Sequence, residues 1–197
     1  MRNLKWFARP DKFKNRLIMV ILGVLIQGFG LSWIIEVSFG TDPCSAFTQG
    51  VISHVPLSFG TAQLLINIIL FVVVFFADTG LIGFGTIANM VFIGYISDFC
   101  RFIYSKTLPA ELFQNTTTRI IILIPALIVF ILGAAMYMTA GLGTSPYDAI
   151  AFIVSERAEN IPFKFIRMSW DIIFLLLGWI MGGNIGVVTF AVAFFLG

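Results

Sequence analysis

The sequence predicts an all-α polytopic membrane protein with about six transmembrane helices, arranged as two inverted three-helix repeats that each carry a short half-helix after the first span. Composition is the first observation behind this fold class. The 197 residues are 59% hydrophobic and only 11% charged, whereas a soluble domain is about a quarter charged. The second observation is that the hydrophobic residues form continuous runs long enough to cross about 30 Å of hydrocarbon as helices.

The third observation is an internal repeat. A shift of 103 residues brings small and helix-breaking residues onto one another without a gap. Because each half contains three hydrophobic segments, an odd number, the second half is expected to enter the membrane in the opposite sense. The aligned pairs are Gly30 with Gly133, Gly40 with Gly143, Thr41 with Thr144, Pro43 with Pro146, Ala46 with Ala149, Gly80 with Gly183, Gly83 with Gly186, Thr86 with Thr189 and Gly94 with Gly197.

The last expected span is short. Only 13 residues remain from Ile185 to Gly197, about 20 Å of helix. We therefore expect the chain to lack its natural C-terminus. The alternative is a short, tilted or half-inserted final helix. The other spans are expected near 17–37, 58–78, 82–104, 120–141 and 162–183.

Basic residues predict the orientation of the chain. The first 16 residues contain six of the twelve Lys and Arg residues and a single acid, Asp11, which places the N-terminus in the cytoplasm by the positive-inside rule. Lys106 and Arg119 near the second outer loop disagree with this assignment. The expected organisation is a basic cytoplasmic segment 1–15, a first membrane repeat 16–104, an outer loop 105–118 and a second membrane repeat 119–197.

Two related motifs follow the first and the fourth span. Asp42 and Ser145 are expected N-caps of short helices, and Ser145 and Asp148 have the spacing of a capping box. Each motif predicts about 11 helical residues, roughly 16 Å or half a membrane. The motifs read Gly40-Thr41-Asp42-Pro43-Cys44-Ser45-Ala46 and Gly143-Thr144-Ser145-Pro146-Tyr147-Asp148-Ala149, with proline at the first helical position of each.

The paired motifs predict a polar site if both half-helices re-enter the membrane from opposite faces. Their N-termini would then meet near the midplane, where free N–H groups and the helix dipoles suit an anionic or otherwise polar small molecule. The alternative is that both helices are amphipathic and lie flat on opposite membrane surfaces. The candidate substrate-binding residues in the motifs are Thr41, Asp42, Ser45, Thr144, Ser145, Tyr147 and Asp148.

Two further candidates lie in the fifth expected span. Asp171 follows Arg167 by one helical turn, so the two side chains share a face and can partly neutralise each other. Because charge is costly in lipid, Asp171 is expected to contact the substrate or a coupling ion, with Arg167 as its partner. The alternative is that Arg167 extends to the interface and Asp171 follows it.

Other charged and sulfur-containing residues are expected to be structural. Glu36 is expected to contact headgroups or water, and Asp98 and Arg101 to form an interfacial pair. Cys44 and Cys100 are expected near the outer face, either as small apolar residues or as a disulfide.

No metal, cofactor or enzymatic activity is expected. The single histidine and two cysteines lack metal-ligand spacing, and no nucleophile is paired with a base. Membrane lipids and a small molecule are the expected partners, and nucleic acid is not. A homo-oligomer or a partner subunit stays open.

The two motifs also carry a family resemblance. Together with the glycine-rich turns that contain Gly83 and Thr86 or Gly186 and Thr189, they resemble those of the bacterial YczE/YitT-like integral membrane proteins. The resemblance covers most of the chain from Arg16 onward, and Cys44 departs from it by standing where an aromatic residue is common. It implies a small multi-pass protein of the bacterial inner membrane and leaves the substrate open.

Inverted repeats with interrupted helices are typical of transporters. The leading interpretation is therefore a small-molecule transporter or permease that works by rocking one repeat against the other. The alternatives are a non-transporting accessory or regulatory membrane subunit, and the substrate-capture subunit of a larger importer.

Overall fold

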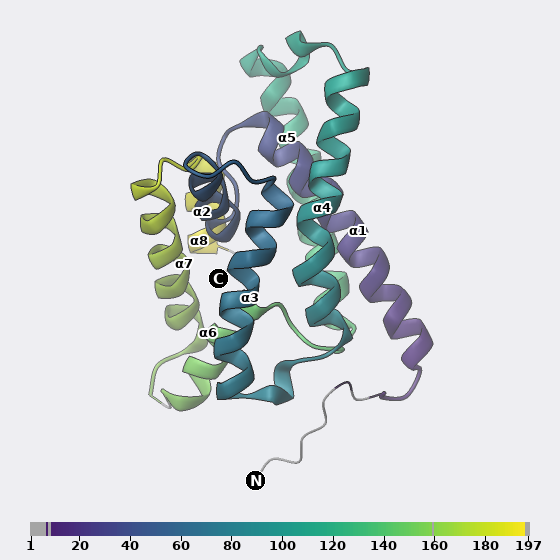
Figure 1. Cartoon of the computed structure of the whole chain (residues 1–197), viewed down its shortest axis with the longest axis vertical. Helices are drawn as coiled ribbons and strands as arrows, with labels where there is room; N and C mark the ends of the chain where they lie inside the picture. Colours follow the sequence, from purple (N-terminus) through teal and green to yellow (C-terminus); the bar gives the residue numbers. More distant parts are fainter. Residues whose placement is uncertain (1–6, 8, 159, 196–197) are drawn as a thin grey trace.

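The computed structural model describes residues 7, 9–158 and 160–195, and all regular elements in these residues are helical (Figure 1). Residues 1–6 and 8 of the expected N-terminal segment, and Gly197 of the repeat alignment, lie outside the described residues. The elements are α1 (Phe13–Val37), α2 (Pro43–Ile52), α3 (Phe59–Ala77), the 3-10 turn η1 (Thr79–Leu81), α4 (Phe84–Thr107), the 3-10 turn η2 (Ala110–Phe113), α5 (Thr116–Thr139), α6 (Pro146–Arg157), α7 (Phe163–Ile180) and α8 (Val187–Phe195).

Four of the described helices are long and apolar enough to cross a membrane, namely α1, α3, α4 and α5. The expected fifth span, α7, has 18 residues but includes three charged side chains, Lys164, Arg167 and Asp171. The helix at the expected sixth span, α8, has nine residues, about 14 Å. The chain is thus a membrane protein with several apolar helices, and four of the six expected spans qualify by length and composition.

The two short helices are packed inside the bundle. Six of the ten residues of α2 and six of the twelve residues of α6 are buried. Figure 1 shows α2 beside one end of α7 and α6 near the other end. This packing favours burial of both motifs over helices that lie flat on a membrane surface.

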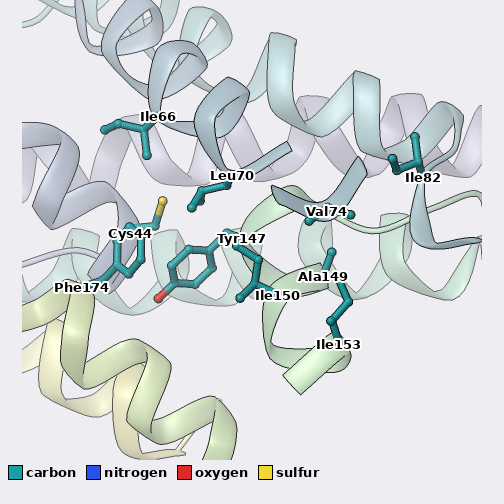
Figure 2. Packing of buried hydrophobic residues seen from close by; sticks show 10 residues of the cluster. All are labelled: Cys44, Ile66, Leu70, Val74, Ile82, Tyr147, Ala149, Ile150, Ile153 and Phe174. Atoms are coloured by element: carbon teal, nitrogen blue, oxygen red, sulfur yellow. The ribbon is translucent and has the colours of Figure 1, made fainter. Parts of the chain in front are cut away.

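An apolar cluster fixes α6 in place. Figure 2 shows side chains from α6 facing α3 residues, with Cys44 of α2 and Phe174 of α7 beside the ring of Tyr147. The centroids of the Tyr147 and Phe174 rings are 4.8 Å apart in an edge-on arrangement. Cys44 is therefore a buried apolar residue of this cluster, and both it and Cys100 are free thiols, so the disulfide alternative does not apply.

Helices α1 and α5 run antiparallel and are joined by an arginine at each end. Arg16 Nη1 donates a hydrogen bond of 2.9 Å to the carbonyl of Ala140, at the end of α5. Arg119 Nε donates one of 2.6 Å to the carbonyl of Val37, at the end of α1. The donor residues are 103 positions apart in the sequence, and so are the acceptor residues.

A second pair of contacts between the halves recurs at the same spacing. The N–H of Gly85 donates to the carbonyl of Leu142 at 2.7 Å, and the N–H of Val188 donates to that of Phe39 at 3.1 Å. Each contact joins the beginning of α4 or α8 to the segment that precedes the short helix of the other half. The structure therefore repeats its inter-half contacts at the spacing found in the sequence.

Glu36 has a protein partner that the sequence did not predict. Its Oε1 accepts a hydrogen bond of 2.7 Å from Arg101 Nε, so α1 and α4 are joined by an ion pair. The expected pair of Asp98 and Arg101 is only a long contact of 4.0 Å. Asp98 Oδ2 instead accepts a hydrogen bond from the N–H of Gly60 at 2.8 Å, which satisfies a free donor in the first turn of α3.

Candidate functional site

The beginnings of α2 and α6 line one cavity of about 220 Å³. Parts of α1, α3, α4, α5, α7 and α8 complete its walls. Six of the nine residues predicted from the sequence line this cavity: Asp42, Ser45, Ser145, Tyr147, Asp148 and Arg167. The structure thus brings together the two helix starts that lie far apart in the sequence.

The start of α2 is capped as its sequence predicts. Asp42 has an extended backbone conformation, and its Oδ1 accepts a hydrogen bond of 3.0 Å from the N–H of Ser45. Pro43 occupies the first helical position, where a missing N–H costs nothing. Thr41 is fully buried next to this cap, outside the cavity lining, and its Oγ1 accepts a hydrogen bond from Gln49 Nε2 at 3.1 Å.

The start of α6 departs from the predicted capping box. Ser145 Oγ accepts from the N–H of Asp148 at 3.1 Å, which is one of the two expected bonds. The N–H of Ser145, however, donates to Tyr137 Oη at 3.2 Å and not to the Asp148 carboxylate. Asp148 Oδ2 accepts instead from Ser145 Oγ at 2.6 Å and from Tyr137 Oη at 3.1 Å. The α5 residue Tyr137 therefore orders this helix start.

The Thr144 hydroxyl takes no part in this cap. The backbone N–H of Thr144 donates to the carbonyl of Leu81 at 3.1 Å, and the Oγ1 of Thr144 is buried without a hydrogen-bond partner among the described residues. Thr144, like Thr41, lies outside the cavity lining.

Arg167 of α7 joins two carboxylates. Its Nη1 lies 2.6 Å from Asp148 Oδ1, and its Nε lies 3.3 Å from Asp171 Oδ2. Tyr147 donates to Asp171 Oδ1 at 2.5 Å, and the guanidinium lies 4.9 Å from the centre of the Tyr147 ring. Arg167 thus points toward α6 and holds the expected contact to Asp171 in addition. Asp171 is only 1% exposed and is not among the residues that line the cavity.

The fixed charges of the site are mostly negative. Asp148 and Asp171 bind the guanidinium of Arg167, the one cationic side chain among the described residues of the lining, and Asp42 lines the same cavity. Carboxylates at the N-terminal ends of α2 and α6 also balance the positive ends of these helix dipoles. The two helix starts therefore offer less to an anion than free N-termini would.

Several carboxamide side chains complete the polar part of the wall. Gln63 and Asn67 of α3 line the cavity, and so do two residues that are not among the predicted candidates, Gln27 and Asn89. Each of these last two is an isolated polar residue in a long apolar run, which is the signal that could have indicated them. In the part of the chain that the structure describes, no three His, Cys, Asp or Glu side chains gather as a metal site.

Similar proteins are membrane or uncharacterised proteins. The chain is 29% identical over 177 residues to the uncharacterized membrane protein YczE of Bacillus subtilis, covering 89% of this chain and 79% of YczE. It is 25% identical to an uncharacterized protein of Haemophilus influenzae, covering 87% and 75% of the two chains. It is also 25% identical to the uncharacterized protein YyaS of Bacillus subtilis, covering 85% and 82%. No solved structure matches.

The family assignment agrees with the resemblance carried by the two motifs. A family described as "Family of unknown function (DUF6198)" matches residues 14–197, which cover the elements from α1 to α8 except the first residue of α1. With YczE as a similar membrane protein, the four apolar helices are those of an integral membrane protein. The chain belongs to the DUF6198 family.

Proposed function

We propose that this chain is a small-molecule transporter of the bacterial cell membrane, with a cytoplasmic N-terminus and one substrate site between the starts of α2 and α6. The observation that carries the proposal is that both capped helix starts line one cavity of about 220 Å³. Pairs of interrupted or half-length helices at a shared polar cavity are typical of transporters built from inverted repeats.

The reciprocal contacts support an inverted repeat. Arg16 and Arg119 exchange equivalent bonds between the ends of α1 and α5, and Gly85 and Val188 exchange equivalent bonds at the beginnings of α4 and α8. Pairs of equivalent contacts that run in both directions between two halves indicate a two-fold axis between them. Since α1 and α5 are antiparallel, the two-fold axis lies across them and not along them.

Each short helix packs against a helix of the other half, α2 against α7 and α6 against α3. This arrangement suggests how the cavity could open in turn to the two sides of the membrane. On the α7 side, the backbone of α2 approaches Gly178 so closely that an added Cβ there would lie 3.0 Å from the N of Phe47. On the α3 side, α6 packs its apolar face against residues such as Leu70 and Val74. We infer that α2 with α7, and α6 with α3, move as units around the cavity.

Uptake into proteoliposomes tests the proposal. The purified full-length chain is reconstituted, incubated with a mixture of small metabolites, and the trapped solutes are identified by mass spectrometry against protein-free liposomes. We expect at least one solute to accumulate. Ala134→Phe places an aromatic ring in the cavity and should abolish this uptake.

Ala135→Phe provides a matched control, because Ala135 is the next residue of α5 and is exposed on the helix surface. It should leave uptake at the wild-type rate. Accumulation no greater than in protein-free liposomes, or equal uptake by Ala134→Phe and the wild type, would contradict the transporter proposal.

A further inference from the structure

We propose that the ligand of this cavity is a small organic cation whose ammonium group lies against the carboxylate of Asp42. The inference deepens the proposed function and rests on it in one respect, that the cavity between α2 and α6 is the substrate site. It concerns the charge of the ligand and does not depend on whether the ligand is carried across the membrane.

The first support is an imbalance of charge. The guanidinium of Arg167 is already shared by Asp148 and Asp171. Asp42 lines the same cavity, yet in the described residues its carboxylate forms no ion pair, and its hydrogen bonds come from the backbone N–H and the side chain of Ser45. Burying a carboxylate without a cation costs several kcal/mol. A positively charged ligand would offset this cost, and an anionic one would raise it.

The second support is an unpartnered acceptor in the same wall. Gln27 lines the cavity from α1, is only 9% exposed, and its Oε1 has no hydrogen-bond partner in the described part of the chain. A carboxamide oxygen only accepts hydrogen bonds, whereas a primary ammonium offers three donors and no acceptor. Because the other described elements leave this buried oxygen unsatisfied, a ligand with N–H donors fits the wall better than one with acceptors alone.

The third support is that the guanidinium and one backbone N–H at each helix start, groups suited to an anion, are already occupied. The N–H of Ser45 donates to Asp42, and the N–H of Asp148 donates to Ser145. Arg167 is bound on two sides by carboxylates. An anion would therefore have to displace a carboxylate before it could bind the guanidinium or the N–H of Ser45, and the Ser145 hydroxyl before it could bind the N–H of Asp148.

Size and wall chemistry narrow the class of cation. A cavity of about 220 Å³ is smaller than the roughly 300–1,000 Å³ of sites for drug-sized ligands. Three phenylalanines line it with the two tyrosines of the site, and aromatic faces attract organic cations. The phenylalanines are Phe130, Phe152 and Phe163.

Ligand binding to the full-length protein in lipid nanodiscs tests the inference. The probes are the chloride salts of methylammonium, ethanolammonium and tetramethylammonium, with sodium acetate and sodium phosphate as anions and glycerol as a neutral solute, all at one ionic strength set with sodium chloride. We expect at least one organic cation to raise the melting temperature in a saturable way. The anions and glycerol should not raise it.

Asp42→Asn separates charge from folding, because asparagine is as good an N-cap as aspartate. It should raise the dissociation constant of the cation at least tenfold, and Asp42→Ser, a second uncharged N-cap, should do the same. Glu111→Gln neutralises an exposed carboxylate of η2 and should leave binding unchanged.

Three results would overturn the inference: no organic cation stabilises the wild type, an anion stabilises it instead, or Asp42→Asn binds the cation as tightly as the wild type. The proposed transport function can fail separately. Uptake of an anion that Ala134→Phe blocks would refute the cationic ligand and leave transport standing. Saturable cation binding that depends on Asp42, without uptake of any solute, would refute transport and leave the cationic ligand standing.

Discussion

Gly143 is the position at which the close approach of the two halves can be tested most directly. Its φ of +102° lies in the left-handed region, which glycine adopts freely and other residues adopt at a cost. A Cβ at this position would lie 2.5 Å from Thr86 Oγ1 and 2.6 Å from the backbone N of Gly83. Because one of these neighbours is backbone, it cannot move aside as a flexible side chain would.

The expected loss for Gly143→Ala is the sum of two effects. A non-glycine residue in the left-handed region costs roughly 1–2 kcal/mol, and forcing an extra carbon into a packed site costs roughly 1–3 kcal/mol. We therefore expect the free energy of unfolding to fall by about 2–5 kcal/mol. Gly40→Ala should behave alike, because φ is +93° and its Cβ would lie 2.5 Å from both Gly186 N and Thr189 Oγ1.

Gly182→Ala is the matched control. Gly182 also has a positive φ, +71°, but no atom lies within 4 Å of a Cβ built there. In the Gly182→Ala variant the free energy of unfolding should fall only by the backbone contribution of roughly 1–2 kcal/mol. The measurement is unfolding of the purified protein in detergent, followed by tryptophan fluorescence. If Gly143→Ala and Gly40→Ala are no less stable than Gly182→Ala, the close approach of the two halves at these glycines is refuted.

Two further predictions concern charged groups that join distant helices. Arg167→Met leaves Asp148 and Asp171 without their shared cation, so the free energy of unfolding should fall by about 3–5 kcal/mol. Adding Asp148→Asn and Asp171→Asn should restore much of this loss. A single Arg167→Met variant as stable as the wild type would contradict the ion pairs of Arg167 with the two carboxylates. Arg16→Gln and Arg119→Gln each remove charged hydrogen bonds to a helix end and should cost about 1.5–3 kcal/mol. Their losses should add in the double variant, because the sites lie at opposite ends of α1, and Lys14→Gln, at an exposed basic residue, should have no measurable effect on the same unfolding curves.

Local chemistry explains which parts of the site the sequence could predict. Asp42 with Pro43, and Ser145 with Pro146, specify helix starts through interactions that span three residues. The contact between Arg167 and Asp171 follows in the same way from helical periodicity. These predictions need no knowledge of which helices are neighbours.

Packing between distant segments explains what the sequence could not predict. Tyr137 Oη accepts from the N–H of Ser145 because the chain turns between α5 and α6, and the sequence does not specify the course of this turn. Arg167 reaches Asp148 across 19 positions of sequence, and Glu36 finds Arg101 across 65. The candidates Thr41 and Thr144 were chosen by their position in the motifs, but both threonines lie outside the cavity lining.

Because each short helix packs against a helix of the other half, this packing determines which helices can move together. Rocking one repeat as a rigid body against the other would separate α2 from α7 and α6 from α3, although these are well-packed contacts. Gly178 and Gly183 let the backbone of α2 lie against α7, and the apolar cluster around Tyr147 ties α6 to α3. Units that combine helices from both halves keep these contacts intact. The boundary between such units then passes through the cavity, where the ammonium group of the proposed ligand would lie against Asp42.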